Sequence, residues 1–133
     1  MRALIVSEDE ILRRMVRLVL GEGVWAFEEA SDAAQARARM GGGWRLLILD
    51  VDTPGVAALA PRKGNGPPAL ALTVGDKPAL LRALGEHSDA VCLLRPFDPT
   101  GLKARVAALT APREKAAAPP PVEAGQDVFY LDA

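Results

Sequence analysis

The sequence predicts an α/β fold built on a parallel sheet. Five short apolar segments alternate along residues 1–110 with segments that have helical periodicity. Strands that alternate with helices in this way indicate βαβ units, in which the strands run parallel. Right-handed crossovers between such strands place helices on both faces of the sheet. We therefore expect a doubly wound three-layer sandwich in which a strand and a helix repeat five times.

The predicted strands differ in their hydrophobic pattern. Residues 2–6 and 46–51 are almost continuously apolar, which is typical of buried strands in a parallel sheet. Residues 24–29 alternate only weakly, so we expect this strand to be partly exposed. The other two strands are predicted at residues 69–73 and 90–94.

The predicted helices are marked by apolar spacing and by residues that start or stop helices. The first has an acidic start, an apolar face and a glycine end at Gly21. Its other face has Arg13, Arg14 and Arg17, which we expect to lie in solvent. Later helices are predicted from Ser31 or Asp32 to Met40, from Pro78 to Gly85 and from Pro99 to Leu109, with about one turn at residues 56–60.

Composition limits the class of protein. The chain has 133 residues and a mass of 14.0 kDa, which fits one domain. Its net charge of −1 gives no positive field for nucleic acid or an anionic membrane. No apolar run approaches the ~18 residues of a membrane span, and the N-terminus turns acidic too early for a signal peptide. We therefore expect a cytoplasmic protein that binds neither nucleic acid nor membrane.

The chain divides into a domain and a tail. We assign residues 1–110 to the domain and residues 111–133 to a Pro/Ala-rich linker with an apolar end. The prolines at 119–121 favour an extended linker. Residues 127–131 are apolar and β-prone again. They are either a frayed terminus or a docking segment that binds this domain or a partner.

For four single residues the sequence predicts a position in the fold and no functional role. Cys92 excludes an internal disulfide because it is the only cysteine, and we expect it to be buried and unreactive. His87 is expected in solvent at a helix end. Trp25 and Trp44 are expected to pack at the edge of the core.

Polar residues follow four of the predicted strands. Because the carboxyl ends of parallel strands meet at one edge of a sheet, we expect these side chains to gather there. Clustered carboxylates suit Mg²⁺, and a hydroxyl and a cation beside an aspartate suit a phosphoryl group. The residues are Ser7, Glu8 and Asp9 after the first strand, Asp50 and Asp52 at the third, Thr73 at the fourth and Arg95 after the fifth.

The motifs at these strand ends resemble a known family. They are Leu-Ile-Val-Ser-Glu-Asp-Glu, Leu-Leu-Ile-Leu-Asp-Val-Asp-Thr-Pro-Gly, Ala-Leu-Thr and Leu-Leu-Arg-Pro-Phe-Asp. In this order they are similar to the receiver domain of bacterial two-component response regulators, over residues 1–110. The resemblance implies a flavodoxin-like (βα)5 sandwich with strand order 2-1-3-4-5. The distance from Asp50 to Thr73 is shorter than in the family, so we expect a shortened third helix.

The resemblance also implies roles for the polar residues. Asp50 corresponds to the phosphoacceptor, and Thr73 and Arg95 correspond to residues that contact the phosphoryl oxygens. Mg²⁺ would be held by Glu8, Asp50 and the backbone carbonyl of Asp52, with Asp9 as an alternative ligand.

Three positions depart from the family pattern. Ser7 stands where the first acid of the metal site is expected, so Mg²⁺ binding should be weak. Arg95 replaces the usual lysine, and we expect it either to pair with unmodified Asp50 or to hold phosphate. Cys92 stands where the family has an aromatic residue that reports the phosphorylation state.

These observations leave three hypotheses about function. The preferred one is an atypical single-domain receiver in a phosphorelay, not an enzyme, with impaired phosphorylation on Asp50. The second is a phosphorylation-independent pseudo-receiver that docks to a protein. The third, a small flavodoxin-like enzyme or cofactor binder, is disfavoured because no glycine-rich phosphate loop follows the first strand.

The resemblance also implies partners. We expect a histidine kinase or phosphotransfer protein and a downstream protein partner, because the residues after 110 are too few for a helix-turn-helix domain. Receivers commonly dimerise through the fourth helix, fifth strand and fifth helix, so we also expect a homodimer through that surface.

Overall fold

The fold is a five-stranded parallel sheet with helices on both faces. The computed structural model describes residues 1–21 and 23–111. The strands, in the order β2-β1-β3-β4-β5 across the sheet, are β1 (Arg2–Val6), β2 (Ala26–Ala30), β3 (Leu46–Asp50), β4 (Ala69–Thr73) and β5 (Val91–Leu94). The helices are α1 (Glu10–Leu20), α2 (Ala33–Arg39), the 3-10 helix η1 (Ala57–Leu59), α3 (Pro78–His87) and α4 (Pro99–Leu109). This confirms the expected doubly wound sandwich and its strand order.

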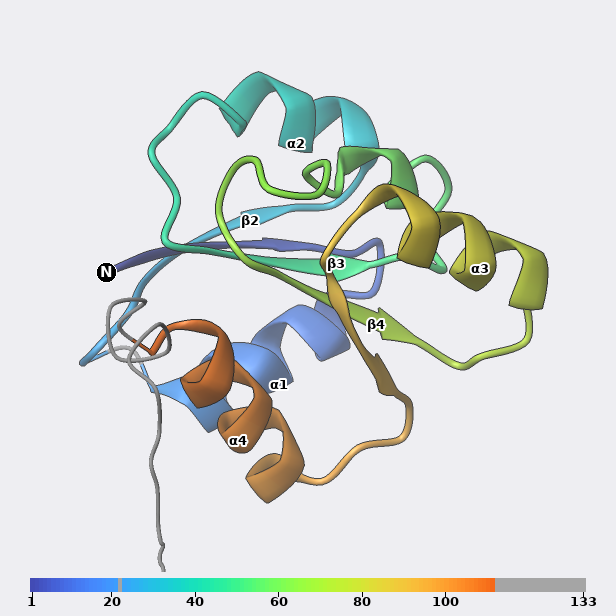
Figure 1. The fold of residues 1–133 in the computed structure, drawn as a ribbon. Helices are drawn as coiled ribbons and strands as arrows, with labels where there is room; N and C mark the ends of the chain where they lie inside the picture. Colours follow the sequence, from blue (N-terminus) through green and yellow to red (C-terminus); the bar gives the residue numbers. More distant parts are fainter. Residues whose placement is uncertain (22, 112–133) are drawn as a thin grey trace, which may run out of the picture.

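The sheet separates two apolar layers. Figure 1 shows α1 and α4 on one face and α2, η1 and α3 on the other. Alternate residues of β1 point to opposite faces, so Leu4 and Val6 join one core cluster while Ala3 and Ile5 join the other. All ten residues of β3 and β4 are buried, as expected for apolar central strands.

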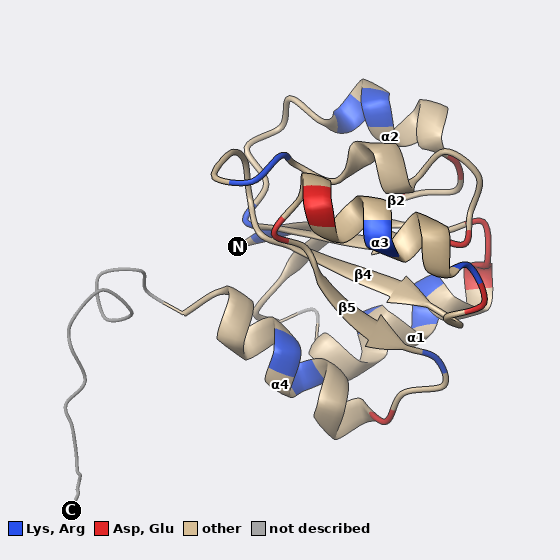
Figure 2. Cartoon of the chain, turned by 45° about the vertical axis from the view of Figure 1, so that its right-hand side comes forward, with Lys and Arg blue, Asp and Glu red and all other residues tan. Residues whose placement is uncertain are grey.

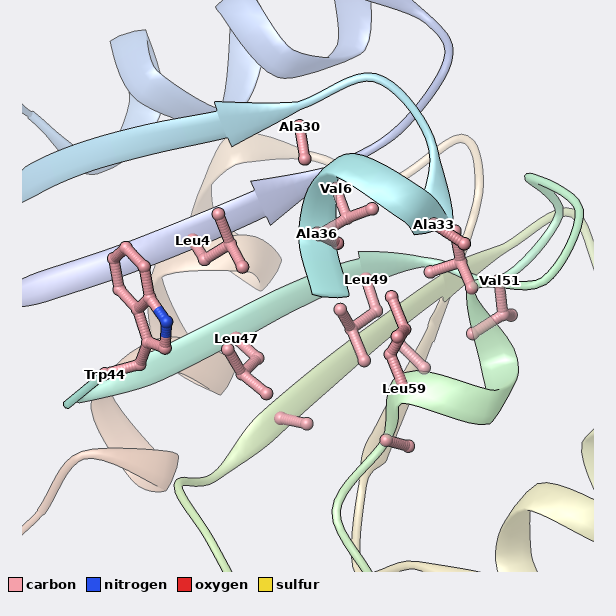
Figure 3. Packing of buried hydrophobic residues seen from close by; sticks show 14 of the residues in the cluster. Leu4, Val6, Ala30, Ala33, Ala36, Trp44, Leu47, Leu49, Val51 and Leu59 are labelled. Atoms are coloured by element: carbon pink, nitrogen blue, oxygen red, sulfur yellow. The ribbon is translucent and has the colours of Figure 1, made fainter. Parts of the chain in front are cut away.

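Small side chains let α2 lie close to the sheet. Ala33 and Ala36 of α2 are buried, and they pack in the same cluster as Leu47 and Leu49 of β3 (Figure 3). The helix begins where the Asp32 carboxylate accepts a hydrogen bond from the Gln35 backbone N–H, one of the two caps expected from the sequence.

The crossover from β3 to β4 contains only the short helix η1, which confirms the shortened third helix. Val56, just before η1, is fully buried, and Leu59 within it is 8% exposed. Both belong to the same core cluster as β3 residue Leu49. Two apolar side chains therefore cover this part of the sheet.

One predicted helix end was wrong. Gly85 lies inside α3, which continues to His87 and closes with a bond from the Ser88 N–H to the Leu84 carbonyl. Leu84 is 4% exposed, and its burial holds this turn of helix despite the low helix propensity of glycine. His87 is half-buried rather than fully in solvent, and its Nε2 lies 3.2 Å from the Ala60 carbonyl oxygen.

Cys92 is exposed, so the expectation that it is buried was wrong. Its register partner is Ala71 of β4, which belongs to the core on the α3 side of the sheet. β5 is the edge strand, and Cys92 and Leu94 on this side remain exposed. Partial burial still raises the pKa of the Cys92 thiol above its usual value, which disfavours the reactive thiolate.

The arginines of α1 do not form a purely solvated face, contrary to the prediction. Arg13 donates to Glu29 Oε1 at 2.8 Å and to the Ser7 carbonyl at 2.7 Å, and its side chain is 14% exposed. Arg17 pairs with the other oxygen of Glu29. Arg14 alone matches the expectation, since its side chain is 69% exposed and it pairs with Glu10. The carboxylate on β2 thus attaches α1 to the sheet.

The two tryptophans pack at the edge of the core, as expected. Trp25 and Trp44 are 6% and 8% exposed. Trp25 stacks near Phe27 with 6.4 Å between ring centroids, and the Arg2 guanidinium lies 4.2 Å from the Trp44 ring centroid.

The predicted linker and apolar tail lie outside the described residues. Among the helices of the described residues, none has the length and hydropathy of a membrane span.

Glu29 offers a test of the attachment of α1. Burial by itself would raise its pKa, but the hydrogen bonds from Arg17 and Arg13 outweigh this and hold the pKa of Glu29 below its usual value of 4.5. A lowered carboxylate pKa stabilises the fold above the unfolded-state pKa, and this contribution is lost as pH falls through the folded-state pKa. Glu29→Gln should therefore reduce the free energy of unfolding at pH 7 by about 0.5–1 kcal/mol.

Urea denaturation at several pH values measures this effect. The difference between wild type and Glu29→Gln should shrink as the pH falls below about 4.5, where the wild-type carboxylate also becomes neutral. Glu10→Gln is the matched control, because the Glu10 side chain is 70% exposed in its pair with Arg14. A loss of unfolding free energy in Glu29→Gln that stays the same at every pH would show that the charge of Glu29 does not stabilise the fold.

Candidate functional site

The carboxyl ends of the strands bring the predicted residues to one edge of the sheet. Asp50 ends β3 and Thr73 ends β4, while Ser7 follows β1 and Arg95 follows β5. Figure 2 shows acidic and basic residues gathered at the end of the sheet to which the strand arrows point. The parallel topology therefore gathers these side chains at one edge of the sheet, as expected from the sequence.

Asp50 is the buried centre of this edge. Its side chain is 4% exposed, and both carboxylate oxygens accept hydrogen bonds. Oδ2 accepts from Ser7 Oγ at 2.7 Å and from Thr53 Oγ1 at 3.2 Å. Oδ1 accepts from the Asp52 backbone N–H at 3.1 Å. These donors offset the cost of removing a carboxylate from water.

Ser7 contributes a hydroxyl where the family has an acid. The residue is fully buried, and its Oγ both donates to Asp50 and accepts from the Asp9 backbone N–H at 3.0 Å. An acid at this position would place a second negative charge beside Asp50 that needs a cation. The serine fills the position with a neutral donor.

Arg95 lies between two carboxylates. Its Nη1 is 3.7 Å from Asp50 Oδ2, and its Nη2 is 3.5 Å from Asp9 Oδ2. The side chain is 25% exposed, so water reaches part of the guanidinium. The ion pair with unmodified Asp50, one of the two expected roles of Arg95, is present in the structure.

Thr73 contacts Asp52, and its expected contact with a phosphoryl group on Asp50 stays a prediction. Its Oγ1 donates to Asp52 Oδ1 at 2.8 Å, and Asp52 Oδ2 accepts from the Val74 backbone N–H at 2.8 Å. Thr73 also accepts from the Gly75 N–H at 3.0 Å. The loop after β4 is thus attached to the loop after β3 through the Asp52 side chain.

Thr53 is a site residue that the sequence analysis missed. Its Oγ1 donates to Asp50 and accepts from the Glu8 backbone N–H at 3.1 Å, so it joins the loops after β1 and β3. Thr53 is 3% exposed. The sequence does contain a signal for this contact. A hydroxyl three residues after an aspartate at a strand end can hydrogen-bond to that carboxylate when the chain turns between them.

The carboxylates do not fit a strong magnesium site. Asp9 Oδ1 accepts from the Ile11 and Leu12 N–H groups and so caps α1, while both oxygens of Asp52 are hydrogen-bonded. Glu8 is exposed. Within residues 1–21 and 23–111, no three His, Cys, Asp or Glu side chains are placed to hold a metal ion together. The predicted set of Glu8, Asp50, Asp9 and the Asp52 carbonyl remains a prediction.

Arg95→Ala tests the ion pair at Asp50. Removing the guanidinium leaves the buried Asp50 carboxylate and the more exposed Asp9 carboxylate without this cation. The variant should lose about 1 kcal/mol of stability, or about 3–6 °C in melting temperature. Thermal denaturation at low ionic strength measures it.

Arg14→Ala is the control for that measurement. Its side chain is 69% exposed in a surface pair with Glu10, so little change is expected. Equal melting temperatures for the two variants would mean that Arg95 does not stabilise Asp50.

Sequence comparison alone does not identify relatives. The chain matches no protein-family model and no curated protein. The motifs quoted above are short, and the departures at Ser7, Cys92 and Arg95 fall within or beside them.

Comparison with solved structures does find relatives. The receiver domain of a response regulator from Bermanella marisrubri is 26% identical, covers 81% of this chain and 96% of its own, and has a TM-score of 0.67. A response regulator receiver domain protein from Methanospirillum hungatei is 19% identical, covers 86% and 97%, and has a TM-score of 0.69. A signal receiver domain from Clostridium thermocellum is 16% identical, covers 84% and 98%, and has a TM-score of 0.68.

These structural neighbours are all receiver domains, and each is covered over nearly its whole length. The resemblance in the motifs is therefore confirmed, and the chain has the receiver fold of two-component response regulators.

Proposed function

We propose that this chain is a receiver-type signalling module that acts by binding protein partners and in which phosphorylation of Asp50 is impaired. Its receiver neighbours support a response-regulator signalling role rather than an enzymatic one. The observation that supports the finer proposal is the environment of Asp50 Oδ2, which contacts Ser7, Thr53 and Arg95.

The surroundings of Asp50 oppose phosphorylation in two ways. A phosphoryl group on Oδ2 would displace the Ser7 and Thr53 hydrogen bonds, each worth about 0.5–1.5 kcal/mol net. The phosphoryl group would also add negative charge at a site that lacks the usual acid for a divalent cation, because Ser7 replaces it. Arg95 supplies one positive charge, but it is shared with Asp9.

Phosphorylation-independent docking is the second candidate. The observation that favours it is the pair between Arg95 and unmodified Asp50, which joins the ends of β5 and β3 without a phosphoryl group. Cys92 in place of the aromatic reporter residue also supports it. In this case the resting conformation is itself the one that partners recognise.

The partners are proposed from the fold. A histidine kinase or phosphotransfer protein would act upstream and a protein target downstream. A homodimer through α3, β5 and α4, which correspond to the fourth helix, fifth strand and fifth helix of the sequence analysis, stays a prediction. Leu94 on β5 is 59% exposed and would lie in that surface.

Direct phosphorylation separates the two candidates. The chain is incubated with Mg²⁺ and a small phosphodonor, and its intact mass is measured with Asp50→Asn as the control. We expect only a minor fraction of wild type, about a tenth or less, to gain one phosphoryl group. Ser7→Asp should raise that fraction, because it restores the missing carboxylate.

Each other outcome has a defined meaning. Nearly complete phosphorylation of wild type that is lost in Asp50→Asn would contradict the impairment. A mass shift that persists in Asp50→Asn would show that another residue is modified. No shift in wild type or in Ser7→Asp would favour the phosphorylation-independent module.

Mg²⁺ affinity tests the metal part of the proposal separately. Wild type should bind Mg²⁺ weakly, and Ser7→Asp should bind about tenfold more tightly because a hard cation gains a charged ligand. Calorimetric titration measures both. Ser31→Asp is the control, since it adds the same charge at a half-buried serine before α2. Equal affinities for wild type and Ser7→Asp would rule out Ser7 as the cause of weak binding.

A further inference from the structure

The short η1 leaves an apolar groove between itself and α3. The two elements lie side by side on one face of the sheet (Figure 1). The groove has a volume of about 400 Å³ and is lined mainly by apolar side chains. The lining residues are Ala57, Ala58, Leu80, Ala83, Leu84 and His87. Ala58 and Ala83 are exposed, so the groove opens to solvent.

The described chain ends near the His87 end of this groove. Leu109, the last residue of α4, lines one cavity together with Arg62 and Ser88. Ser88 directly follows His87. The Thr110 carbonyl accepts a hydrogen bond from Arg45 Nη2 at 2.8 Å, which anchors the chain at this point. Figure 2 shows the end of α4 and the end of α3 on the same side of the molecule, opposite the strand arrowheads.

The sequence beyond this point contains a segment of suitable chemistry. Residues 127–132 are Asp-Val-Phe-Tyr-Leu-Asp, four apolar or aromatic residues between two acids. A connection of this length, residues 112–126, can reach at most about 50 Å. Helix α3 has 10 residues and is therefore about 15 Å long. The connection is long enough for the segment to lie along α3.

Charge at the groove complements the acids of that segment. Arg62 and Lys63 lie at its His87 end, where the Lys63 N–H donates to the His87 carbonyl at 3.0 Å. Neither basic side chain is in an ion pair with another residue of the described part of the chain. An acid beside an apolar segment can therefore reach an unpaired cation here.

We propose that residues 127–132 of this chain bind in the groove between η1 and α3. The aromatic residues of the segment pack against Leu80, Leu84 and the groove alanines, and its acids pair with Arg62 and Lys63. The segment occupies the surface left open by the shortened third helix. This contact goes beyond the proposed function and does not depend on whether Asp50 is phosphorylated.

Hydrogen exchange of the full chain, followed by mass spectrometry, tests the proposal. Amides of residues 127–132 should exchange more slowly in the native chain than in the chain unfolded by denaturant. Ala83→Glu places a charge in the groove and should speed that exchange about tenfold. Ala79→Glu is the matched control, because Ala79 is an exposed alanine of α3 that does not line the groove, and it should leave the exchange unchanged.

Three results would overturn the proposal. The first is exchange of residues 127–132 at the unfolded rate in wild type. The second is protection that survives Ala83→Glu, which would place the segment elsewhere. The third is protection that disappears on about hundredfold dilution, because binding within one chain is independent of concentration whereas binding to a second copy is not.

Discussion

A carboxylate at the end of a fully buried strand must find hydrogen-bond donors, and this requirement organises the whole functional edge. Asp50 finds its donors on separate segments: Ser7 after β1, and Thr53 and the Asp52 N–H after β3. Arg95 adds a cation from the end of β5. Three strand ends are therefore held together by one side chain. The β1, β3 and β5 loops cannot rearrange independently while that carboxylate stays buried and satisfied.

The same edge shows how a serine in place of an acid at position 7 changes the partners that the neighbouring charged residues need. With an acid at position 7, a cation would be needed to hold two carboxylates together. With Ser7, the site has one acid fewer, and Arg95 faces both Asp50 and Asp9. Thr73 donates to Asp52, which attaches the loop after β4 to the loop after β3. The departures at positions 7 and 95 therefore both act on the same carboxylate, Asp50.

The fold was predictable from the sequence because its signals are local and repeated. The continuous apolar runs at β3 and β4 correspond to strands that are buried along their whole length. The errors arose where neighbours in space, not in sequence, decide the outcome. Arg13 resembles any solvated helix residue until Glu29 on β2 is placed beside it. Cys92 has the hydrophobicity of a core residue, but β5 is an edge strand and α3 leaves that face open.

The residues of the candidate site were predicted from the sequence better than the contacts between them. The periodicity and the parallel topology are sufficient to predict which residues lie at strand ends, and therefore at one edge of the sheet. These residues are Ser7, Asp50, Thr73 and Arg95. The aspartate to which each hydroxyl donates depends on the backbone path of loops that are only a few residues long. The sequence pattern does not determine such paths, so the hydrogen bonds from Thr53 to Asp50 and from Thr73 to Asp52 were not predicted.

The crossover from β3 to β4 indicates how little chain is needed to cover a sheet. Val56 and Leu59 close the core over a crossover whose only helix is η1, and the sheet keeps its full strand order. Polar substitutions at Val56 or Leu59 should consequently be removed by selection, because these two side chains close the core over the crossover.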